Sequence, residues 1–325
     1  MTLPDVTFTM TYSVNGEPHI LNGFDTNTGY TFHLIEFSDV GLPPITRITQ
    51  RGAFQHGETN IDYRINPRSF VIRGFVEANS TYEHMKVRDM LGKLFKVSNT
   101  ASQLKVESTQ TLTEPPYTEE IITRAIDCYV EGGINVSSDT SAGYSVFFDV
   151  QLRATNPFWY NPAESKVTLS NVTTGDPTDV PLLVPRTYGT IGINSTVSVP
   201  YAGTFRSFPI IYVYGGDGGI TNLEIINNSA LAPKFGAIQK NLSIRLYSVP
   251  AYSTFTIDLR QGYKTVKNQN GEDMLAYVDP SSNLTSFALF PTLEYGSNEN
   301  ILDVSGTSST NAYVTMTYYT QYTSI

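Results

Sequence analysis

The chain has 325 residues, of which 40% are hydrophobic, 12% are aromatic and only 16% are charged. This length favours two domains, and sparse charge with 21 tyrosines favours β-strands and surfaces that neighbouring subunits cover. The net charge of −9 argues against a protein that grips nucleic acid, because phosphate binding needs clustered Lys and Arg. The single cysteine, Cys128, excludes a disulfide framework or a cysteine-based zinc site within one chain.

The sequence predicts no targeting or membrane segment. The first residues lack a basic stretch followed by an apolar one, so no signal peptide is expected. No segment reaches the roughly 18 apolar residues that span a bilayer. We therefore expect synthesis in a cytoplasm and no membrane insertion.

The first half is patterned as strands. Alternation over 6–14, the turn signal Asn15-Gly16 and the apolar pair at 20–21 predict an opening hairpin. Runs rich in β-branched and aromatic residues predict further strands. These lie at 30–37, 64–76, 103–108, 120–131 and 144–155.

One helix is predicted within this β pattern. Ser80, with Glu83 three residues later, forms a capping box. An apolar stripe at helical spacing follows, made of Val87, Met90, Leu91, Leu94 and Phe95. The sequence predicts a helix over about 81–97 that packs this stripe on a sheet.

The first domain is expected to end near the only tryptophan. Pro157 cannot donate to a sheet ladder, so the strand before it stops. We interpret Phe158, Trp159 and Tyr160 as a wedge between domains, in preference to an exposed binding patch. The predicted domains are 1–163 and 164–325.

The second domain is predicted to be an antiparallel β-sandwich, because short strands are separated by Gly, Pro and Asn clusters. The expected strands are 165–170, 197–201, 208–214, 220–226, 242–247, 253–259, 274–278, 284–290 and 312–323.

Familiar catalytic and metal-binding motifs are missing. The chain lacks paired Asp-Thr/Ser-Gly loops, a nucleophile elbow, a His-Glu-x-x-His motif and phosphate-binding glycine loops. The histidines show no zinc spacing, and the loop 215–219 offers calcium a single carboxylate. A carboxylate pair for glycoside hydrolysis is the one enzymatic alternative left open. We predict no catalytic residue, no cofactor and no metal.

Segments along nearly the whole chain resemble the distal tail proteins of long-tailed, non-contractile bacteriophages. The resemblance rests on the order and spacing of these segments and on no single motif. They are Gly52–Gly57, Tyr63-Arg64, Arg68–Gly74, Met85–Phe95, Thr155–Tyr160, Tyr201–Pro209, Ile225–Asn227 and Phe255–Asp258.

The resemblance implies a hexameric ring at the distal end of the tail tube in the virion. It implies an N-terminal β-sandwich with one helix and a protruding hairpin, which forms the ring around a channel for DNA. A galectin-like or carbohydrate-module-like sandwich is then expected to project outward. The implied partners are the tail tube protein, the hub or tip protein, the tape measure protein and receptor-binding proteins at the rim.

Few residues are candidates for contacts in such a ring. Gln55, His56 and Gly57 are expected in a loop at a ring contact, since Gly57 offers backbone freedom. Arg64 and Arg68 are candidates for ion pairs across subunits, with solvation as the alternative. Two other functions stay open: a carbohydrate-binding protein whose tyrosines stack on sugar rings, and a tail tube or hub subunit.

Overall fold

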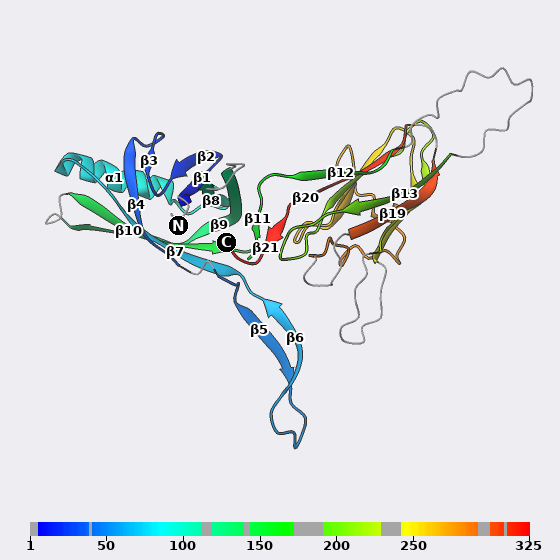
Figure 1. The fold of residues 1–325 in the computed structure, drawn as a ribbon, viewed down its shortest axis with the longest axis horizontal. Coiled ribbons are helices and arrows are strands. Elements are labelled where there is room, and N and C mark those ends of the chain that lie inside the picture. The colour runs from blue at the N-terminus through cyan, green and yellow to red at the C-terminus, as the bar shows by residue number, and fades with distance from the viewer. Residues whose placement is uncertain are drawn as a thin grey trace, which may run out of the picture. The chain divides into compact units, whose positions relative to one another are not determined.

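The computed structural model describes residues 6–38, 41–111, 119–139, 144–171, 191–228, 242–291, 300–308 and 311–325. The chain divides into unit 1, Met1–Pro162 with Tyr322–Ile325, and unit 2, Ala163–Gln321. The last four residues thus return to unit 1, whereas the sequence placed them in the second domain. Both units are built mainly from antiparallel strands (Figure 1), as predicted.

Unit 1 contains a ten-stranded sheet with the order β2-β1-β8-β9-β10-β7-β4-β3, to which β11 and β21 attach off this path. Its strands are β1 Val6–Val14, β2 Glu17–Ile20, β3 Phe24–Asp25, β4 Tyr30–Ser38, β7 Arg68–Val76, β8 Ser102–Thr111, β9 Glu119–Asp139, β10 Ser145–Ala154, β11 Trp159–Tyr160 and β21 Gln321–Tyr322. β9 runs past its predicted end at 131. The φ angles of Gly132 and Gly133 are +79° and +86°, where the register with β10 shifts. These two glycines let the long strand bend without breaking.

The predicted helix is present as α1, Thr81–Leu94. The Ser80 hydroxyl accepts the Glu83 N–H at 3.2 Å, and the Glu83 carboxylate accepts the Asn79 N–H at 2.8 Å. The capping interaction read from the sequence is therefore confirmed. Its apolar stripe joins the buried core of unit 1, with Leu91 fully buried.

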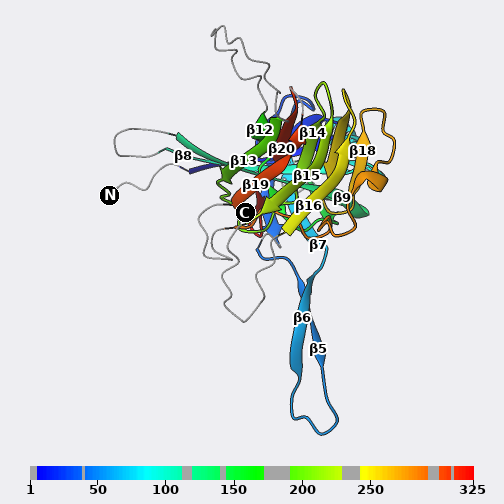
Figure 2. The ribbon, with the colours of Figure 1, turned by 90° about the vertical axis from the view of Figure 1, so that its right-hand side faces the viewer.

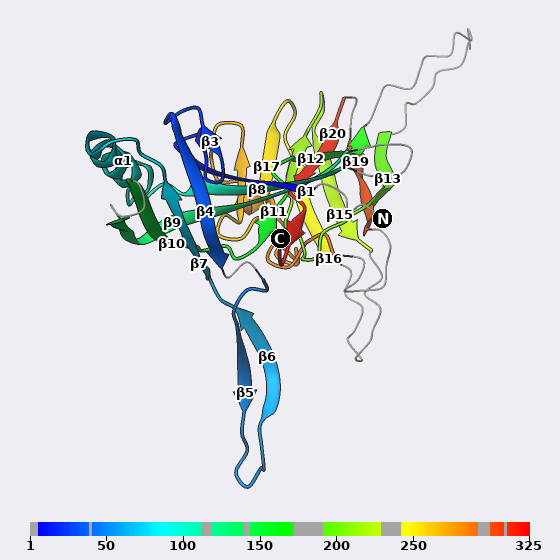
Figure 3. The ribbon, with the colours of Figure 1, turned by 60° about the vertical axis from the view of Figure 1, so that its left-hand side comes forward.

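Two strands outside this sheet form a hairpin. β5 (Ile45–Gln50) pairs with β6 (Thr59–Ile65) in a separate two-stranded sheet. The hairpin extends away from the rest of unit 1 in all views (Figures 1, 2 and 3). The single strand expected over 64–76 is thus two strands, divided at Asn66 and Pro67, where the proline cannot donate to a ladder.

Unit 2 is a sandwich of a five-stranded sheet, β12-β20-β14-β17-β18, and a four-stranded sheet, β13-β19-β15-β16 (Figure 2). The strands are β12 Ser165–Asn171, β13 Ile191–Val199, β14 Ile210–Tyr214, β15 Ile220–Asn227, β16 Leu242–Val249, β17 Thr254–Asp258, β18 Thr265–Asn268, β19 Asn300–Ser308 and β20 Tyr313–Tyr318. Apolar residues from both sheets form one buried core. The predicted sandwich is confirmed.

Two of the strands expected in unit 2 are wrong. The segment 274–278 holds a short 3-10 helix, Leu275–Tyr277, and 284–290 forms no strand. The apolar run Phe287–Phe290 is buried, but it pairs only at an isolated bridge between Leu289 and Ser207, and amide side chains bind the neighbouring backbone groups. Asn227 Nδ2 donates to the Ala288 carbonyl at 2.8 Å, and Asn300 Oδ1 accepts the Phe290 N–H at 2.8 Å.

Candidate functional site

The β5–β6 hairpin is the most distinctive surface of unit 1. Its strands pair with each other and with no other described strand. Every residue of β5 is exposed, and so is every residue of β6 except half-buried Ile65. An isolated two-stranded hairpin is only marginally stable in water. A partner that covers the hairpin would therefore stabilise it.

The two faces of the hairpin differ in chemistry. Residues opposite each other in the ladder share a face. Ile45 lies opposite Ile65, and Tyr63 lies opposite Arg47, which makes this face largely apolar. Ile45 and Tyr63 are 52% and 49% exposed, so this apolar surface has no cover within the described chain.

The opposite face is more polar. Thr46 lies opposite Arg64, and Asp62 lies opposite Ile48. An uncovered apolar face with a polar reverse side is typical of a protein–protein contact surface. The hairpin is therefore a candidate for assembly.

The residues expected at a ring contact lie in the loop at the hairpin tip. Gln55 orders this loop, because its Oε1 accepts the Gly52 N–H at 2.9 Å and its Nε2 donates to the Thr59 hydroxyl at 2.8 Å. His56 is exposed beside it. Gly57 has φ +82°, a conformation that favours glycine. Phe54 was not among the predicted contact residues, although its side chain is fully exposed and its φ angle is +69°.

The two candidate arginines lie in different surroundings. Arg64 is exposed on β6. Arg68 is only 1% exposed, and its Nη2 donates to the Thr323 carbonyl at 2.7 Å. Arg68 therefore holds the C-terminal residues onto unit 1. Its burial does not fit the prediction of an ion pair across subunits or of a solvated side chain, because both require an exposed guanidinium.

The residues expected as a wedge lie in unit 1. Trp159 is fully buried in its core, and its ring lies 5.5 Å from that of Phe70. Phe158 is also buried. Tyr160 is half-buried, and its hydroxyl donates to Asp127 at 2.8 Å. These contacts stabilise unit 1 itself.

Two observations on the described residues concern metal binding and nucleophilic chemistry. No group of three or more His, Cys, Asp or Glu side chains that could hold a metal ion is found among them. Burial raises the pKa of Cys128 to about 12, so its thiol stays protonated at neutral pH and is a poor nucleophile. Within the same described residues, no helix is long and apolar enough to cross a membrane.

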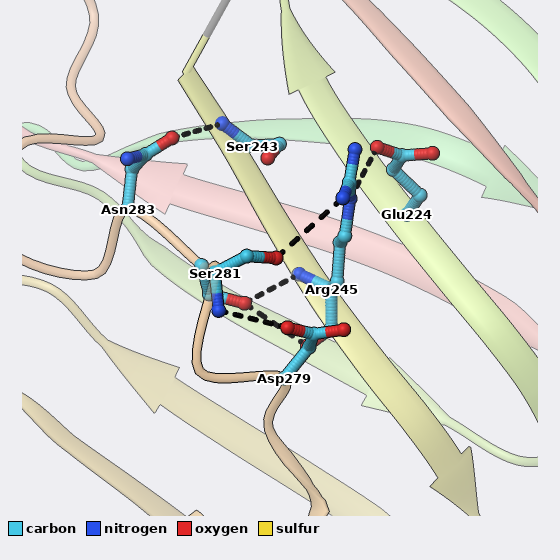
Figure 4. A network of polar contacts seen from close by, with 7 residues as sticks. Glu224, Ser243, Arg245, Asp279, Ser281 and Asn283 are labelled. Atoms are coloured by element: carbon cyan, nitrogen blue, oxygen red, sulfur yellow. Dashed lines mark hydrogen bonds and ion pairs between the residues drawn. The ribbon is translucent and has the colours of Figure 1, made fainter.

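A polar cluster on unit 2 was not anticipated from the sequence (Figure 4). Arg245 on β16 donates through Nε to Glu224 on β15 at 2.6 Å. The loop after the 3-10 helix runs beside β16. There the Asn283 side chain accepts the Ser243 N–H at 3.0 Å, and the Ser282 hydroxyl accepts the Arg245 N–H at 2.9 Å. This loop covers the edge of the four-stranded sheet and protects it from pairing with other chains.

In the part of the chain that the structure describes, these features define a β protein of two units, with one α-helix, an uncovered hairpin and a terminal sandwich unit. The structure is similar to the crystal structure of the SPP1 Dit (gp 19.1) protein, described as a paradigm of the hub adsorption apparatus in phages that infect Gram-positive bacteria. The TM-score is 0.57 at 14% sequence identity, over 97% of this chain and 99% of that chain. The chain therefore has the fold of a Dit protein, as the resemblance in the sequence predicted.

Weaker likenesses extend to the baseplate of phage P2 in its activated conformation. The match to the calcium form has a TM-score of 0.45 at 8% identity, covering 96% of this chain and 98% of that chain. The strontium form gives 0.43 at 9% identity with the same coverage. Likeness at this level supports no further argument. No family model and no curated protein sequence matches the chain.

Proposed function

We propose that this chain is a structural protein of a phage tail, which assembles with copies of itself into a hexameric ring at the distal end of the tail tube. The observation that carries the proposal is the likeness to the SPP1 Dit fold over 97% of the chain. In this role the chain works without catalysis, cofactor or metal. Unit 1 forms the ring, and unit 2 faces outward.

The hairpin supplies the chemistry for self-assembly. A closed ring requires two different patches on each subunit that fit together head to tail. The apolar face with Ile45 and Tyr63 is one such patch, because it has no cover within the described chain. Gln55, His56 and Arg64 lie on the same hairpin and extend this contact.

The remaining partners follow from the proposed place in the tail. The ring joins the tail tube protein to the hub or tip protein, next to the tape measure protein, and carries receptor-binding proteins at its rim. The net charge of −9 suits a channel through which DNA slides, since clustered cations would bind phosphate.

Electron microscopy of the purified chain tests this proposal, with native mass spectrometry for stoichiometry. We expect a six-fold ring with a central hole. Tyr63→Asp places a charge on the apolar face of the hairpin and should abolish the ring. Thr46→Asp is the matched control, because it places the same charge on the opposite face beside Arg64.

Both variants should melt like the wild type, since the hairpin lies outside the buried core. A chain that stays monomeric at its highest soluble concentration and is absent from purified particles would refute the proposal. A ring that forms equally well with Tyr63→Asp would exclude the hairpin as the contact.

A further inference from the structure

Unit 1 contains the last four residues of the chain, which follow unit 2 in the sequence. The chain leaves unit 1 after Pro162, forms unit 2 from Ala163 to Gln321, and returns to unit 1 at Tyr322. Tyr322–Ile325, here called the clasp, are therefore the last residues of unit 1 to be synthesised. Unit 1 can complete its contacts only after all of unit 2 has been made.

Tyr322 packs the clasp against unit 1. Its side chain lies against the buried core of this unit, and the guanidinium carbon of Arg124 on β9 lies 3.3 Å from the centre of its ring. Arg124 is half-buried. A guanidinium over an aromatic ring is attracted by the ring electrons, and this attraction is stronger where water is excluded. The clasp therefore stabilises a cation that β9 places partly out of water.

Thr323 provides the second contact of the clasp. Arg68, the first residue of β7, is 1% exposed, and its Nη2 donates to the Thr323 carbonyl at 2.7 Å. A buried charge is costly unless hydrogen-bond acceptors surround it. The clasp thus provides an acceptor for a buried cation that lies 255 residues earlier in the chain.

Arg68 lies next to the base of the β5–β6 hairpin. Only Asn66 and Pro67 separate it from Ile65, the last residue of β6. At this base the Asn66 N–H donates to the Pro44 carbonyl at 2.8 Å, which closes the hairpin below its first ladder pair. Pro67 has a fixed φ angle, so it allows little independent movement between Asn66 and Arg68. A contact that fixes Arg68 therefore also restrains the base of the hairpin.

We propose that the clasp is a conformational device that restrains the base of the hairpin only in a chain synthesised to its C-terminus. A chain that ends before the clasp lacks both the Tyr322 ring over Arg124 and the Thr323 carbonyl at Arg68. Its strands still form, but the segment between β6 and β7 opens more often. This coupling is a property of the single chain, so it goes beyond the proposed role in the tail and does not rest on it.

The test compares the full chain with a variant that ends at Gln321. Hydrogen–deuterium exchange followed by mass spectrometry reports local opening at the Asn66 amide. This amide should exchange about tenfold faster or more without the clasp, since a hydrogen bond to a charged group contributes about a ten- to hundredfold factor. Fractions of the same oligomeric state are compared, because contacts between copies would also slow exchange. Peptides from the core strands of unit 2 should exchange as in the full chain.

The matched control is a chain that ends at Ser324. It keeps Tyr322 and Thr323 and loses only the exposed Ile325, so exchange at the base of the hairpin should equal that of the full chain.

A second pair of variants keeps the full length, in case the shortened chain does not fold. Tyr322→Ala removes the ring over Arg124 and should also speed exchange of the Asn66 amide, whereas Tyr322→Phe keeps the ring and should not.

Arg68→Met separates the clasp contact from a general loss of stability, with the unfolding of unit 1 followed by Trp159 fluorescence. In the full chain this substitution removes the Thr323 contact and should lower the melting midpoint by about 3 °C or more. In the chain that ends at Gln321 it removes a buried cation that has lost this acceptor, so the midpoint should fall less or rise.

Two results would overturn the inference. One is an equal effect of Arg68→Met in the full and the shortened chain. The other is an Asn66 amide whose exchange is unchanged by loss of the clasp or by Tyr322→Ala. Ring formation alongside either result would leave the proposed function intact.

Discussion

Replacing Gly74 by alanine probes how tightly the strands of unit 1 pack. Gly74 lies within β7, where an added Cβ would lie 2.6 Å from the His33 carbonyl oxygen and 2.8 Å from Cζ of Phe148. The Phe148 ring is 3% exposed and packs against the rings of Phe32 and Phe95. Neither the backbone oxygen nor the enclosed ring can move aside freely. The strand itself must shift.

The expected magnitude combines two opposing effects. Overpacking of this kind costs about 1–3 kcal/mol of unfolding free energy. Replacing glycine by alanine also restricts the unfolded chain, which offsets about 0.4–1 kcal/mol. The mid-range values leave a net loss of about 1.3 kcal/mol, which lowers the melting temperature of a unit of this size by about 3–5 °C.

Fluorescence isolates this effect, because Trp159 is the only tryptophan and lies in the core of unit 1. Its emission reports the unfolding of unit 1, and calorimetry reports both units. Gly92→Ala in α1 is the matched control. An added Cβ there meets nothing within 4 Å, so better helix propensity should stabilise unit 1 by about 0.5–1 kcal/mol. A Gly74→Ala midpoint at or above the wild-type value, with Gly92→Ala behaving as expected, would refute the packing argument.

Three further predictions concern unit 1. Ser80→Ala removes the acceptor of the Glu83 N–H and should cost about 1 kcal/mol, measured by denaturant titration; an unchanged midpoint would contradict the cap. Burial alone would raise the pKa of Asp25, but hydrogen bonds, of which that of His19 is the strongest, lower it below 3.8. The Asp25 carboxylate therefore stabilises unit 1 above about pH 4, and this stabilisation is lost as the pH falls through the lowered pKa. Asp25→Asn should therefore flatten the loss of stability below about pH 4, and an unchanged acid profile would exclude this cause. Trp159→Ala should destabilise unit 1 by about 3–5 kcal/mol in calorimetry, and a shift confined to the transition of unit 2 would show that the ring acts elsewhere.

A capping interaction between nearby residues made the start of α1 predictable. No such local interaction marks its C-terminal end, which was predicted too late. Ser80 and Glu83 interact within four residues, so their pairing is visible in the sequence. No glycine marks the C-terminus, and Phe95, the predicted continuation of the apolar stripe, is the C-cap. The helix therefore ends three residues before the predicted position.

Long-range contacts account for the wrong strands in unit 2. The run Phe287–Phe290 has the apolar character of a buried strand, and it is buried. Leu289 pairs with Ser207 in an isolated bridge, and the side chains of Asn227 and Asn300 bind the backbone of Ala288 and Phe290 from 61 and 10 residues away. Periodicity reports burial of the side chains, but it does not report what binds the backbone.

The candidate surfaces differ in how far the sequence revealed them. The hairpin came from family resemblance, since its apolar residues do not alternate cleanly with polar ones across the bulge between Ile48 and Thr49. The Arg245–Glu224 ion pair depends on the β15–β16 register, which brings Glu224 beside Arg245 across 21 residues of sequence.

The hairpin face of unit 1 and the Arg245 cluster of unit 2 respond differently to burial. An apolar hairpin face gains free energy when another surface covers it. The Arg245 cluster on unit 2 presents polar groups that hydrogen bonds hold in place and that remain partly exposed to water. Burying this cluster in a subunit interface would cost the desolvation of its charged groups. The polar cluster is therefore more stable in contact with water, whereas the hairpin face gains free energy when it is covered.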